Sequence, residues 1–332
     1  MLSATRTLTR ERRHMATSDT ASNTPALAPA FAPIQTSRRI LLVNDMAGYG
    51  KVALSAMIPI LSSLRHQVFN LPTALVSNTL DYGVFDILET TGYMRNAIAA
   101  WDELGFAFDA VATGFLVSEE QTRLVADFCR ARKAAGSQIF VDPIMGDDGA
   151  LYNGVGEATV GYMREMCASA DVIMPNITEA TLLTGLFREK SKPGAAPLTR
   201  PEADRLVGAL HELGPRSVVV TSCPVDEALS GSASGHATLV GEAGETLQAL
   251  PYDEVPVRFP GTGDIFSAVL IGDVLAGTTL ARACRHAMDT VRDLLVENAG
   301  NEDRFKGIPV ELYLDRIAGA ATGATKEVRH GA

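Results

Sequence analysis

Short apolar runs alternate with amphipathic stretches along the chain from Arg39 onward. This alternation is typical of buried strands that crossover helices connect into a mostly parallel sheet. The runs that we expect to form strands are residues 40–44, 110–113, 138–142, 172–174 and 218–222. The pattern therefore predicts an α/β fold with a mostly parallel central sheet.

The clearest helix signal covers residues 118–135. Ser118 and Gln121 have the spacing of a capping box, an apolar face follows them, and Gly136 ends the pattern. The pattern changes after the last expected strand. Residues 236–242 and 245–251 flank an Ala-Gly pair as in a β-hairpin, and a helix-rich tail over residues 263–298 closes the domain.

The composition changes once, near residue 38. The preceding stretch mixes arginines with an Ala- and Pro-rich segment and has neither helical nor strand periodicity. We therefore expect residues 1–38 to be a disordered extension, residues 39–318 to form the folded domain and residues 319–332 to be a flexible tail. A dispensable extension is favoured over an organellar targeting signal, because Glu11 and the prolines interrupt an amphipathic helix.

The composition excludes two classes of partner. The 332 residues are 46% hydrophobic and 20% charged, and no apolar run approaches the roughly eighteen residues that cross a bilayer. The net charge of −10 repels a polyphosphate backbone at long range. We therefore expect neither a nucleic acid nor a membrane as partner, whereas backbone amides and local dipoles can still bind a small anion.

Four cysteines are scattered through the chain, with no CxxC pair and no histidine at metal-ligand spacing. They are Cys129, Cys167, Cys223 and Cys284. We interpret them as buried or idle thiols in a reducing compartment, which favours a cytoplasmic protein.

Ligands of an open α/β sheet bind outside the carboxyl ends of its strands, so polar segments after each run are candidates for chemistry. One such segment is the glycine turn 261–263, which runs through Asp264 into an apolar helix. Convergent backbone N–H groups and the helix dipole predict an anion site there. Asp264 is then either a general base beside that site or a carboxylate that stabilises the first turn of the helix.

Two further segments carry carboxylates after a strand end. Residues 142–149 contain three aspartates, which suit either an outer-sphere site for Mg²⁺ with a nucleotide or a solvated loop with Asx turns. Asn176 and Glu179 follow another strand with the spacing of a helix cap. Spacing alone favours the cap over a role for Glu179 at Mg²⁺-bound water.

The fourth candidate region combines the loop 44–51 with residues 71–83. The loop has too few glycines for a dinucleotide fingerprint, and it is not a P-loop. Any phosphate must therefore be held by other groups.

These segments, in this order, resemble the pyridoxal kinases of the ribokinase-like superfamily, in particular the bacterial pyridoxamine/pyridoxal kinase branch. The resemblance covers residues 39–314 and rests on the joint occurrence of VDPIMGD (141–147), PNITE (175–179), VVTS (219–222) and GTGD (261–264) at family-like separations. It implies a ribokinase-like three-layer α/β/α sandwich with a small β lid. It also implies ATP-dependent phosphorylation of the 5′-hydroxymethyl group of pyridoxal, pyridoxamine or pyridoxine, with Mg²⁺ and optionally a monovalent cation such as K⁺, by a homodimer.

The resemblance also implies roles for single residues on the phosphate side. Asp264 takes the proton from the substrate hydroxyl, while Gly261, Thr262 and Gly263 cradle the transferring phosphoryl group. The residues implied in ATP binding are Asp142, Asp147, Tyr152, Asn176, Thr221 and Ser222, and those implied at Mg²⁺ are Asp142 and Glu179.

On the vitamin side, Asp45 and Thr73 fall where the family contacts polar atoms of the pyridine ring. Tyr49 and Tyr82 either pack on the ring or the lid or are ordinary core aromatics. The chain departs from the family here, because many pyridoxal kinases have Ser in place of Asp45 and His-Thr-Gly in place of residues 79–81. A carboxylate at position 45 suits a ring N–H⁺ or a substrate amine, which makes pyridoxamine as good a candidate substrate as pyridoxal.

Two alternative functions stay open at this point. Hydroxymethylpyrimidine kinase shares the fold and the anion hole, although its Gly- and Ser-rich N-terminal loop is not found here. A degenerate family member that binds a B6 vitamer without catalysis is the other alternative, and the presence of Asp264 argues against it. A further departure is Met174, which stands where the family often has Thr.

Overall fold

The computed structural model describes residues 37–152 and 155–321 of the chain. The expected extension over residues 1–38 and the expected tail over residues 319–332 lie almost wholly outside these residues. The strands are β1 Arg39–Tyr49, β2 Gln67–Asn78, β3 Ile87–Glu89, β4 Ala110–Thr113, β5 Gln138–Val141, β6 Gly146–Asp147, β7 Ala150–Leu151, β8 Val172–Ile173, β9 Ser217–Pro224, β10 His236–Glu242 and β11 Gln248–Pro251. The α-helices are α1 Ala53–Ser63, α2 Thr91–Leu104, α3 Glu119–Ala134, α4 Ala158–Ser169, α5 Ile177–Thr184, α6 Arg200–Glu212, α7 Glu227–Ser230, α8 Thr262–Leu275, α9 Leu280–Asn298 and α10 Leu314–Ala321.

Most of the strands form one sheet in the order β11-β10-β9-β8-β5-β4-β1-β2-β3. The pairs from β9 to β2 are parallel, whereas β10 and β11 at one edge and β3 at the other join antiparallel. Strand β2 lies on one side of β1 in the sheet, and β4 lies on the other side of β1. The direction in which strands are added to the sheet therefore reverses between β1 and β4. The carboxyl ends of these two strands are therefore where an α/β sheet of this kind binds its ligand.

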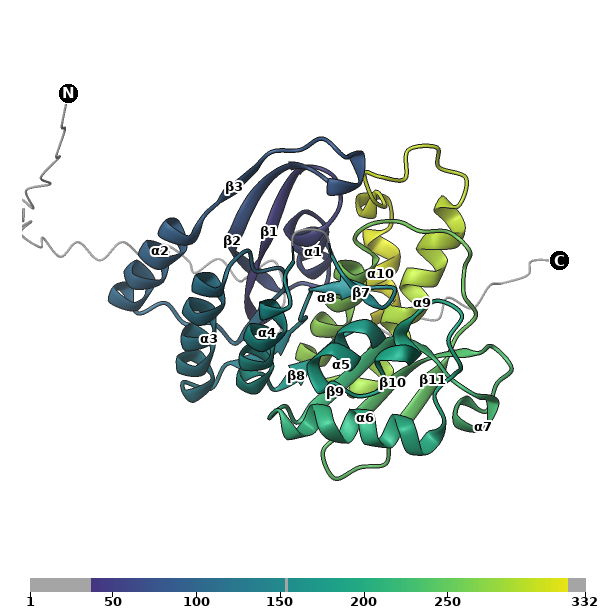
Figure 1. Ribbon diagram of the computed structural model, residues 1–332. Coiled ribbons are helices and arrows are strands. Elements are labelled where there is room, and N and C mark those ends of the chain that lie inside the picture. The colour runs from purple at the N-terminus through teal and green to yellow at the C-terminus, as the bar shows by residue number, and fades with distance from the viewer. Residues whose placement is uncertain (1–36, 153–154, 322–332) are drawn as a thin grey trace, which may run out of the picture. The chain divides into compact units, whose positions relative to one another are not determined.

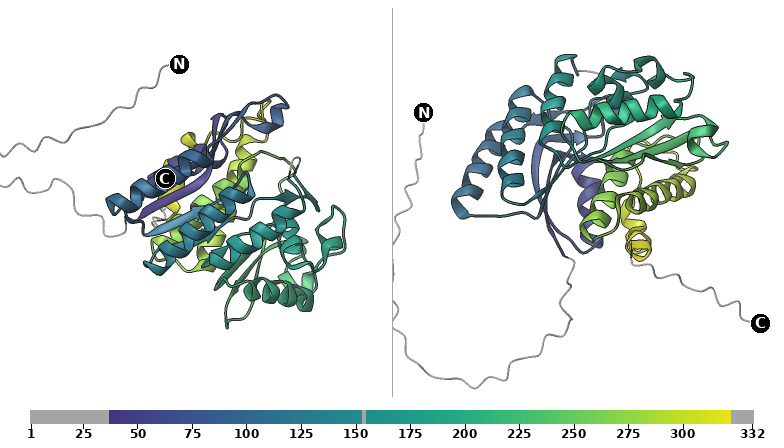
Figure 2. Two further views of the ribbon diagram at one scale, coloured as in Figure 1. Left: turned by 60° about the vertical axis from the view of Figure 1, so that its left-hand side comes forward. Right: turned by 90° about the horizontal axis from the view of Figure 1, so that it is seen from below.

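Helices cover both faces of the sheet (Figures 1 and 2). One hydrophobic core lies between the sheet and helices α2 to α6 and receives Leu41 and Val43 of β1. The other lies under α1, α8, α9 and α10 and receives Ile40 and Leu42 of the same strand. Successive strand residues point to opposite faces, so each buried strand contributes to both cores. The molecule is the three-layer α/β/α sandwich that the sequence predicts, and the two-stranded sheet β6–β7 is the small β element beside it.

The five expected strands are β1, β4, β5, β8 and β9, and the expected hairpin is β10–β11. The expected loop 44–51 is wrong in part, because β1 continues to Tyr49 and pairs with β2. The pattern does not predict β2, since Pro72 interrupts it and the exposed Phe69 and Leu75 spoil its alternation. Pro72 is tolerated there because it pairs next to a register shift, in a part of β2 that has no strand on its far side.

Helix α3 confirms the helix expected at residues 118–135, and its cap differs in one bond. The Ser118 side chain accepts from the Gln121 N–H as expected. The Gln121 side chain, however, accepts from the Val117 N–H and donates to the Thr73 carbonyl at 2.8 Å, so it joins α3 to β2. Within the described residues, no helix is long and apolar enough to cross a membrane.

Helix α8 lies at the centre of the molecule and confirms the start of the expected helical tail. Its residues from Ile265 to Asp273 are all buried, which fits a helix that is apolar around most of its circumference. The four cysteines are also buried, as expected. The position of α8 matters for function because its first turn carries the glycine turn and Asp264.

Candidate active site

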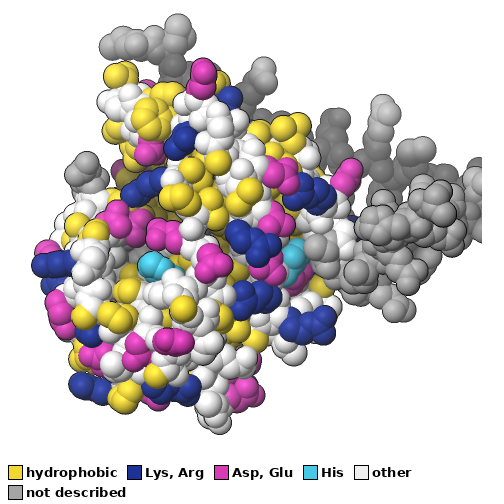
Figure 3. All heavy atoms as spheres, turned by 90° about the vertical axis from the view of Figure 1, so that its right-hand side faces the viewer, with side chains coloured by type: hydrophobic (Ala, Val, Ile, Leu, Met, Phe, Trp, Pro, Cys, Tyr) yellow, Lys and Arg dark blue, Asp and Glu magenta, His cyan; other side chains and the backbone are white. Residues whose placement is uncertain are grey.

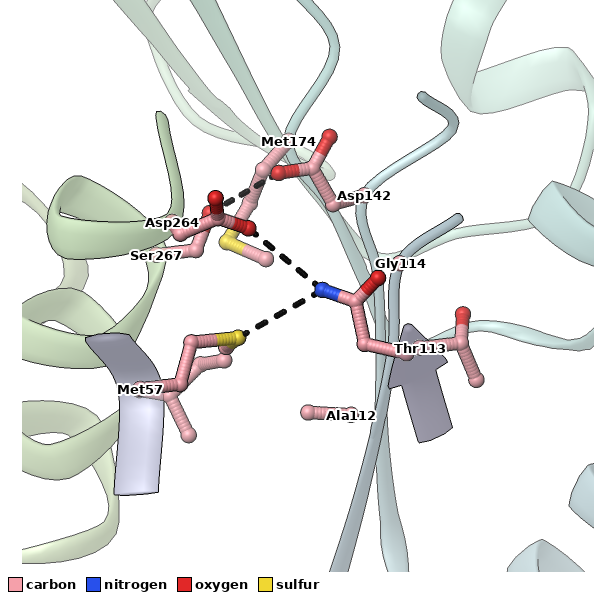
Figure 4. A pocket seen from close by; sticks show the side chains of 10 residues that line it. Met57, Ala112, Thr113, Gly114, Asp142, Met174, Asp264 and Ser267 are labelled. Carbon is pink, nitrogen blue, oxygen red and sulfur yellow. Dashed lines mark hydrogen bonds between the residues drawn. The ribbon is translucent and has the colours of Figure 1, made fainter. Parts of the chain in front are cut away.

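A small cavity lies at the carboxyl ends of β1 and β4, where the strand order reverses (Figure 4). It has room for about one water molecule. The residues that line it are Asn44, Met57, Ala112, Thr113, Gly114, Asp142, Met174, Asp264, Ser267 and Ile271. Asp142 and Asp264, which the sequence places 122 positions apart, approach each other here from different elements (Figure 4).

The glycine turn places Asp264 at this cavity. Gly261 has a φ of 84°, and a Cβ at this position would lie 2.5 Å from the Lys51 carbonyl oxygen. The left-handed backbone and the close approach both require glycine. Thr262 and Gly263 begin α8, and the first N–H groups of a helix have no intrahelical partner, so this turn can bind an anion as the sequence predicts.

The carboxylate of Asp264 is held by groups outside its own helix. Its Oδ2 accepts from the Ala53 N–H at 2.7 Å, and its Oδ1 accepts from the Asn44 amide at 3.4 Å. Burial raises the pKa of Asp264 to about 6, against the opposing effect of these two donors. A carboxyl with this pKa is ionised at neutral pH and still accepts a proton readily, which suits a general base.

Asp142 follows β5 and faces the same helix. Its Oδ2 accepts from the Ser267 hydroxyl at 3.0 Å, and Ser267 lies one turn after Asp264 on α8. Burial, and after it the charge of Asp264, raises the pKa of Asp142 to about 7. The first two turns of α8 thus present the Asp264 carboxylate and the Ser267 hydroxyl towards the end of β5.

Glu179 lies in the first turn of α5 and is buried. The Asn176 side chain accepts from the Glu179 N–H, and the Glu179 carboxylate accepts from the Asn176 N–H at 2.9 Å, so the expected helix cap is confirmed. The other carboxylate oxygen accepts from the Met145 N–H at 3.0 Å. Burial and the charge of Asp142 raise the pKa of Glu179. Glu179 therefore ties the loop after β5 to α5.

The neighbouring carboxylates give a test for Mg²⁺. Burial raises the pKa values of Asp142 and Glu179, and so do the charge of Asp264 on Asp142 and the charge of Asp142 on Glu179. A nearby cation would relieve that repulsion. No group of three or more His, Cys, Asp or Glu side chains among the described residues is placed to hold a metal directly. The carboxylate oxygens of Asp142 and Glu179 are ligands of the kind that suit Mg²⁺, which prefers oxygen and keeps several of its waters.

The small sheet β6–β7 carries two of the residues expected near the phosphates. Asp147 ends β6, and Tyr152, which is 40% exposed, follows β7. The guanidinium of Arg258 lies 3.6 Å from Asp147 and 3.2 Å from Asp148. Arg258 stands three residues before Gly261, so this ion pair joins the small sheet to the glycine turn.

The expected nucleotide residues Asn176, Thr221 and Ser222 lie on neighbouring strand ends. Asn176 and Thr221 form a parallel bridge, and the Thr221 N–H donates to the Pro175 carbonyl at 3.0 Å. Ser222 is exposed and adopts a left-handed φ of 59°. Strained backbone of this kind is common at functional sites.

On the vitamin side, Asp45 is half-buried on β1, next to the register shift with β2. Burial and the charge of Asp264 raise the pKa of Asp45 to about 7. Thr73 is wholly buried, and its hydroxyl donates to the Phe115 carbonyl at 2.9 Å. The structure therefore brings Asp45 close enough to Asp264 for their charges to interact, whereas the Thr73 side chain lies in the interior and supports the segment after β4.

Tyr49 and Tyr82 are neighbours, with ring centroids 6.0 Å apart, and neither is a core aromatic. Tyr49 is 57% exposed. The Tyr82 hydroxyl donates to Asp303 at 2.8 Å, and the Tyr82 ring meets Phe305 edge-on at 5.6 Å. The two tyrosines thus form an aromatic cluster with the segment that follows α9.

Sequence reasoning missed several residues that shape the site. Asn44 and Ala53 hold Asp264, Ser267 holds Asp142, and Arg258 holds the small sheet. A usable signal for Asn44 is an amide at the end of an otherwise apolar buried strand. The role of Ala53 comes from its backbone N–H, so the residue type gives no signal.

The surface in Figure 3 carries Lys and Arg side chains interspersed with Asp and Glu. The view covers one face of the molecule only. On that face the mixture differs from the continuous basic patch with which proteins hold a nucleic-acid backbone.

Comparison with known proteins places this site in a family. The sequence profile of the phosphomethylpyrimidine kinases matches residues 56–306, a span that includes the glycine turn and Asp264. The chain belongs to this family. A pyridoxine/pyridoxal/pyridoxamine kinase from Bordetella avium strain 197N is 31% identical over 253 residues, which cover 74% of this chain and 80% of that protein.

Solved structures agree with this assignment. A protein from Bacteroides thetaiotaomicron VPI-5482, assigned as a phosphomethylpyrimidine kinase and crystallised with pyridoxal, is 34% identical with a TM-score of 0.75 and covers 85% of this chain and 96% of its own. The pyridoxal kinase of Leishmania donovani in complex with ADP and pyridoxamine is 24% identical with a TM-score of 0.70 and covers 84% of this chain and 95% of its own, which shows a shared fold. The resemblance to pyridoxal kinases and the ribokinase-like fold expected from the sequence are confirmed.

Proposed function

We propose that the protein phosphorylates the 5′-hydroxymethyl group of a B6 vitamer, pyridoxal, pyridoxamine or pyridoxine, with ATP as phosphoryl donor. The observation that carries this proposal is the partly buried Asp264 carboxylate, held by the Ala53 N–H beside the Gly261–Gly263 turn, at the carboxyl ends of β1 and β4. A base next to an anion-binding helix start is the arrangement that phosphoryl transfer to an alcohol requires. The vitamers named for the relatives supply the substrate class.

In this reaction Asp264 accepts the proton of the substrate hydroxyl as the hydroxyl oxygen attacks the γ-phosphorus of ATP. The bond from that phosphorus to the β-phosphate bridging oxygen breaks, and ADP leaves. The N–H groups of the glycine turn stabilise the negative charge on the transferring phosphoryl group. Phosphoryl transfer needs mainly alignment and charge stabilisation, so few protein groups must take part in covalent chemistry.

We further propose that Asp142 and Glu179 face Mg²⁺ through its water ligands, and that Asp147, Tyr152, Asn176, Thr221 and Ser222 face the nucleotide. Bound Mg²⁺ would neutralise charge on the phosphates. The raised pKa values of Asp142 and Glu179 support this role, because burial and neighbouring negative charge oppose the ionised form of each carboxyl and a cation would favour it. A monovalent cation such as K⁺ belongs to the proposal only through the family resemblance.

Asp45 gives the vitamer preference a physical basis. Its carboxylate lies close enough to Asp264 for the two charges to interact. A substrate with a protonated ring nitrogen or an amine would balance the two carboxylates by charge-assisted hydrogen bonding. We therefore propose that Asp45 binds the cationic part of the vitamer and that Tyr49 and Tyr82 flank it.

We propose that the enzyme is a cytoplasmic homodimer. The edge of the sheet at β3 exposes apolar side chains, among them Phe85, Ile87 and Leu88, and an exposed apolar patch of this kind is typical of an interface. The buried thiols suit a reducing compartment. Light scattering of the purified protein measures the expected mass of two chains.

Hydroxymethylpyrimidine kinase activity is the second candidate, and the name of the matching family favours keeping it. The test is ADP release with ATP and Mg²⁺, measured against pyridoxal, pyridoxamine, pyridoxine, hydroxymethylpyrimidine and ribose. We expect the three vitamers to give the highest kcat/KM. Turnover of hydroxymethylpyrimidine alone would replace the proposal by the second candidate, and binding of a vitamer without ADP release would indicate a non-catalytic binder.

A further inference from the structure

Asn44 is 2% exposed and lies between the end of β4 and the start of α8. Its side-chain oxygen accepts two backbone N–H groups, from Asp45 at 3.0 Å and from Phe115 at 2.8 Å. Two donors at one end of the amide identify that end as the oxygen, so the NH₂ group must point the other way. It points to Asp264 Oδ1 at 3.4 Å and to the Met57 sulfur at 3.8 Å, and both contacts are drawn as dashed lines in Figure 4.

The surroundings keep the Asn44 amide in this orientation. A Cβ on Gly114 would lie 2.5 Å from the Asn44 nitrogen, so the residue after β4 must be glycine for the amide to fit. Phe115 is held in turn, because the Thr73 hydroxyl donates to its carbonyl at 2.9 Å. A donor fixed by the fold in this way need not reorganise when charge changes on its acceptor.

The two oxygens of Asp264 are therefore held from two sides. The Ala53 N–H, at 2.7 Å, fixes Oδ2, and the Asn44 amide donates to Oδ1 at 3.4 Å. One bond leaves a carboxylate free to rotate about its Cβ–Cγ bond, whereas a second bond sets that rotation. Bonds to a catalytic group are often long without substrate and shorten when the substrate is bound, which fits the 3.4 Å contact.

We propose that Asn44 is a positioning residue for the general base, and that its amide holds the Asp264 carboxylate in the orientation that accepts the substrate proton. The inference rests on the proposed function, in which Asp264 is that base. Asn44 acts through Asp264 and does not itself touch the reacting atoms.

Two substitutions separate this role from a purely structural one. The structural role would come from the amide oxygen, which ties β1 to the segment after β4. Asn44→Asp keeps that oxygen and the shape of the side chain but places a second oxygen where the donor faced Asp264. Asn44→Ala removes both functions.

The experiment is a double-mutant cycle at pH 8.5, with each Asn44 variant made both in the wild type and in Asp264→Asn. In the wild type we expect kcat to fall roughly tenfold or more for both variants, with the KM for ATP changed by less than about twofold. In Asp264→Asn we expect the same substitutions to change kcat by less than about twofold, because the group through which Asn44 acts is absent.

Ser137→Ala is the matched control. Its buried hydroxyl donates to the Phe108 carbonyl at 2.7 Å, just before β5 begins and therefore at the opposite end of the sheet from Asp142. We expect it to lower the melting temperature while leaving kcat unchanged in both backgrounds. A melting curve for each variant shows that the losses of kcat come from folded protein.

Two results would overturn the inference about Asn44 without affecting the proposed function. Equal fold-losses in both backgrounds would make Asn44 an anchor of the segment after β4, and an unchanged kcat for Asn44→Asp would show that the donor is not needed. A wild type that turns over no vitamer would instead refute the proposed function and the inference together. If Asn44→Ala does not fold, the kcat of Asn44→Asp in the two backgrounds still tests the inference.

Discussion

Asp45 is the residue at which this chain departs from the family pattern in the most informative way. It stands where many pyridoxal kinases have Ser, and the structure places it where its charge interacts with that of Asp264. Burial, and after it the repulsion from the Asp264 carboxylate, raises the pKa of Asp45 to about 7. A cationic substrate group removes that repulsion.

Substitution of Asp45 by Ser should therefore change the vitamer preference. Charge-assisted hydrogen bonds contribute about 1.5–3 kcal/mol, so we expect kcat/KM for pyridoxamine and for pyridoxal to change by factors that differ roughly tenfold or more. The KM for ATP should stay nearly constant. Steady-state kinetics with both vitamers measures this, and equal losses for both would make Asp45 a support for β1 only.

At the scale of elements, the start of α8 is the anion site that we propose for the phosphoryl group. Gly261 and Gly263 are both part of the predicted anion site, but their surroundings differ. A Cβ at Gly261 would overlap the Lys51 carbonyl, whereas a Cβ at Gly263 would meet no protein atom within 4 Å. The fold therefore requires glycine at position 261. At position 263 the protein itself leaves room for a side chain, so a requirement for glycine there would come from the bound ligand.

Substitution of each glycine by Ala tests this difference. Gly261→Ala should lower the melting temperature, because it combines a left-handed φ with a steric overlap. Gly263→Ala should leave the melting temperature within about 1 °C and still raise the KM for ATP several-fold, because its methyl group enters the space of the phosphates. Unchanged kinetics in Gly263→Ala would place the phosphates elsewhere.

The sequence predicts the strands in the middle of the sheet and the hairpin at one edge, and it misses β2 and β3 at the other edge. The parallel strands in the middle of the sheet are short apolar runs, so periodicity finds β4, β5, β8 and β9 within a few residues. Strand β2 is not predicted, because Pro72 and the exposed apolar residues of the strand interrupt the alternation of apolar and polar positions. The caps at Ser118 and Asn176 are local, so spacing predicts them, whereas the second bond of Gln121 crosses to β2 and cannot be read from neighbours in sequence.

The same distinction holds for the site. Asp264 and the glycine turn are local motifs and could be predicted. The donors Asn44 and Ala53 lie 220 and 211 positions from Asp264 in the sequence, so no local pattern indicates that they contact it. The Ala53 contact also uses a backbone N–H, which every residue but proline has. The family resemblance assigns Thr73 to the pyridine ring, whereas its side chain is buried and donates to the Phe115 carbonyl.

At the scale of the whole molecule, the site concentrates carboxylates in the centre of the fold. The folded-state pKa values of Asp45, Asp142 and Asp264 are raised to about 7, 7 and 6 from an ordinary value of 3.8. Between about pH 4 and pH 7 the folded state therefore binds more protons than the unfolded state. These groups therefore contribute stability that is fully present below about pH 4 and is lost as the pH rises through about 7.

The pH dependence of stability should therefore oppose that of activity. Activity requires ionised Asp264, so kcat/KM should fall as the pH drops below about 6. Asp45→Asn removes one half-buried charge, so its melting temperature without ligand should exceed that of the wild type at pH 8, and the difference should shrink towards zero near pH 4. Calorimetry at the two pH values measures the difference, and an equal gain at both would mean that the charge of Asp45 carries no cost in the fold.

The central claim is that the Asp264 carboxylate is the general base, and Asp264→Asn tests it most directly. The substitution keeps the shape of the side chain and an oxygen for the Ala53 N–H but removes the proton acceptor. We expect kcat with the preferred vitamer to fall by at least roughly 10²-fold, while calorimetric titration gives an ATP affinity close to that of the wild type. Turnover within a few-fold of the wild type would contradict the account, because it would make Asp264 a structural residue at the start of α8 and place the base elsewhere.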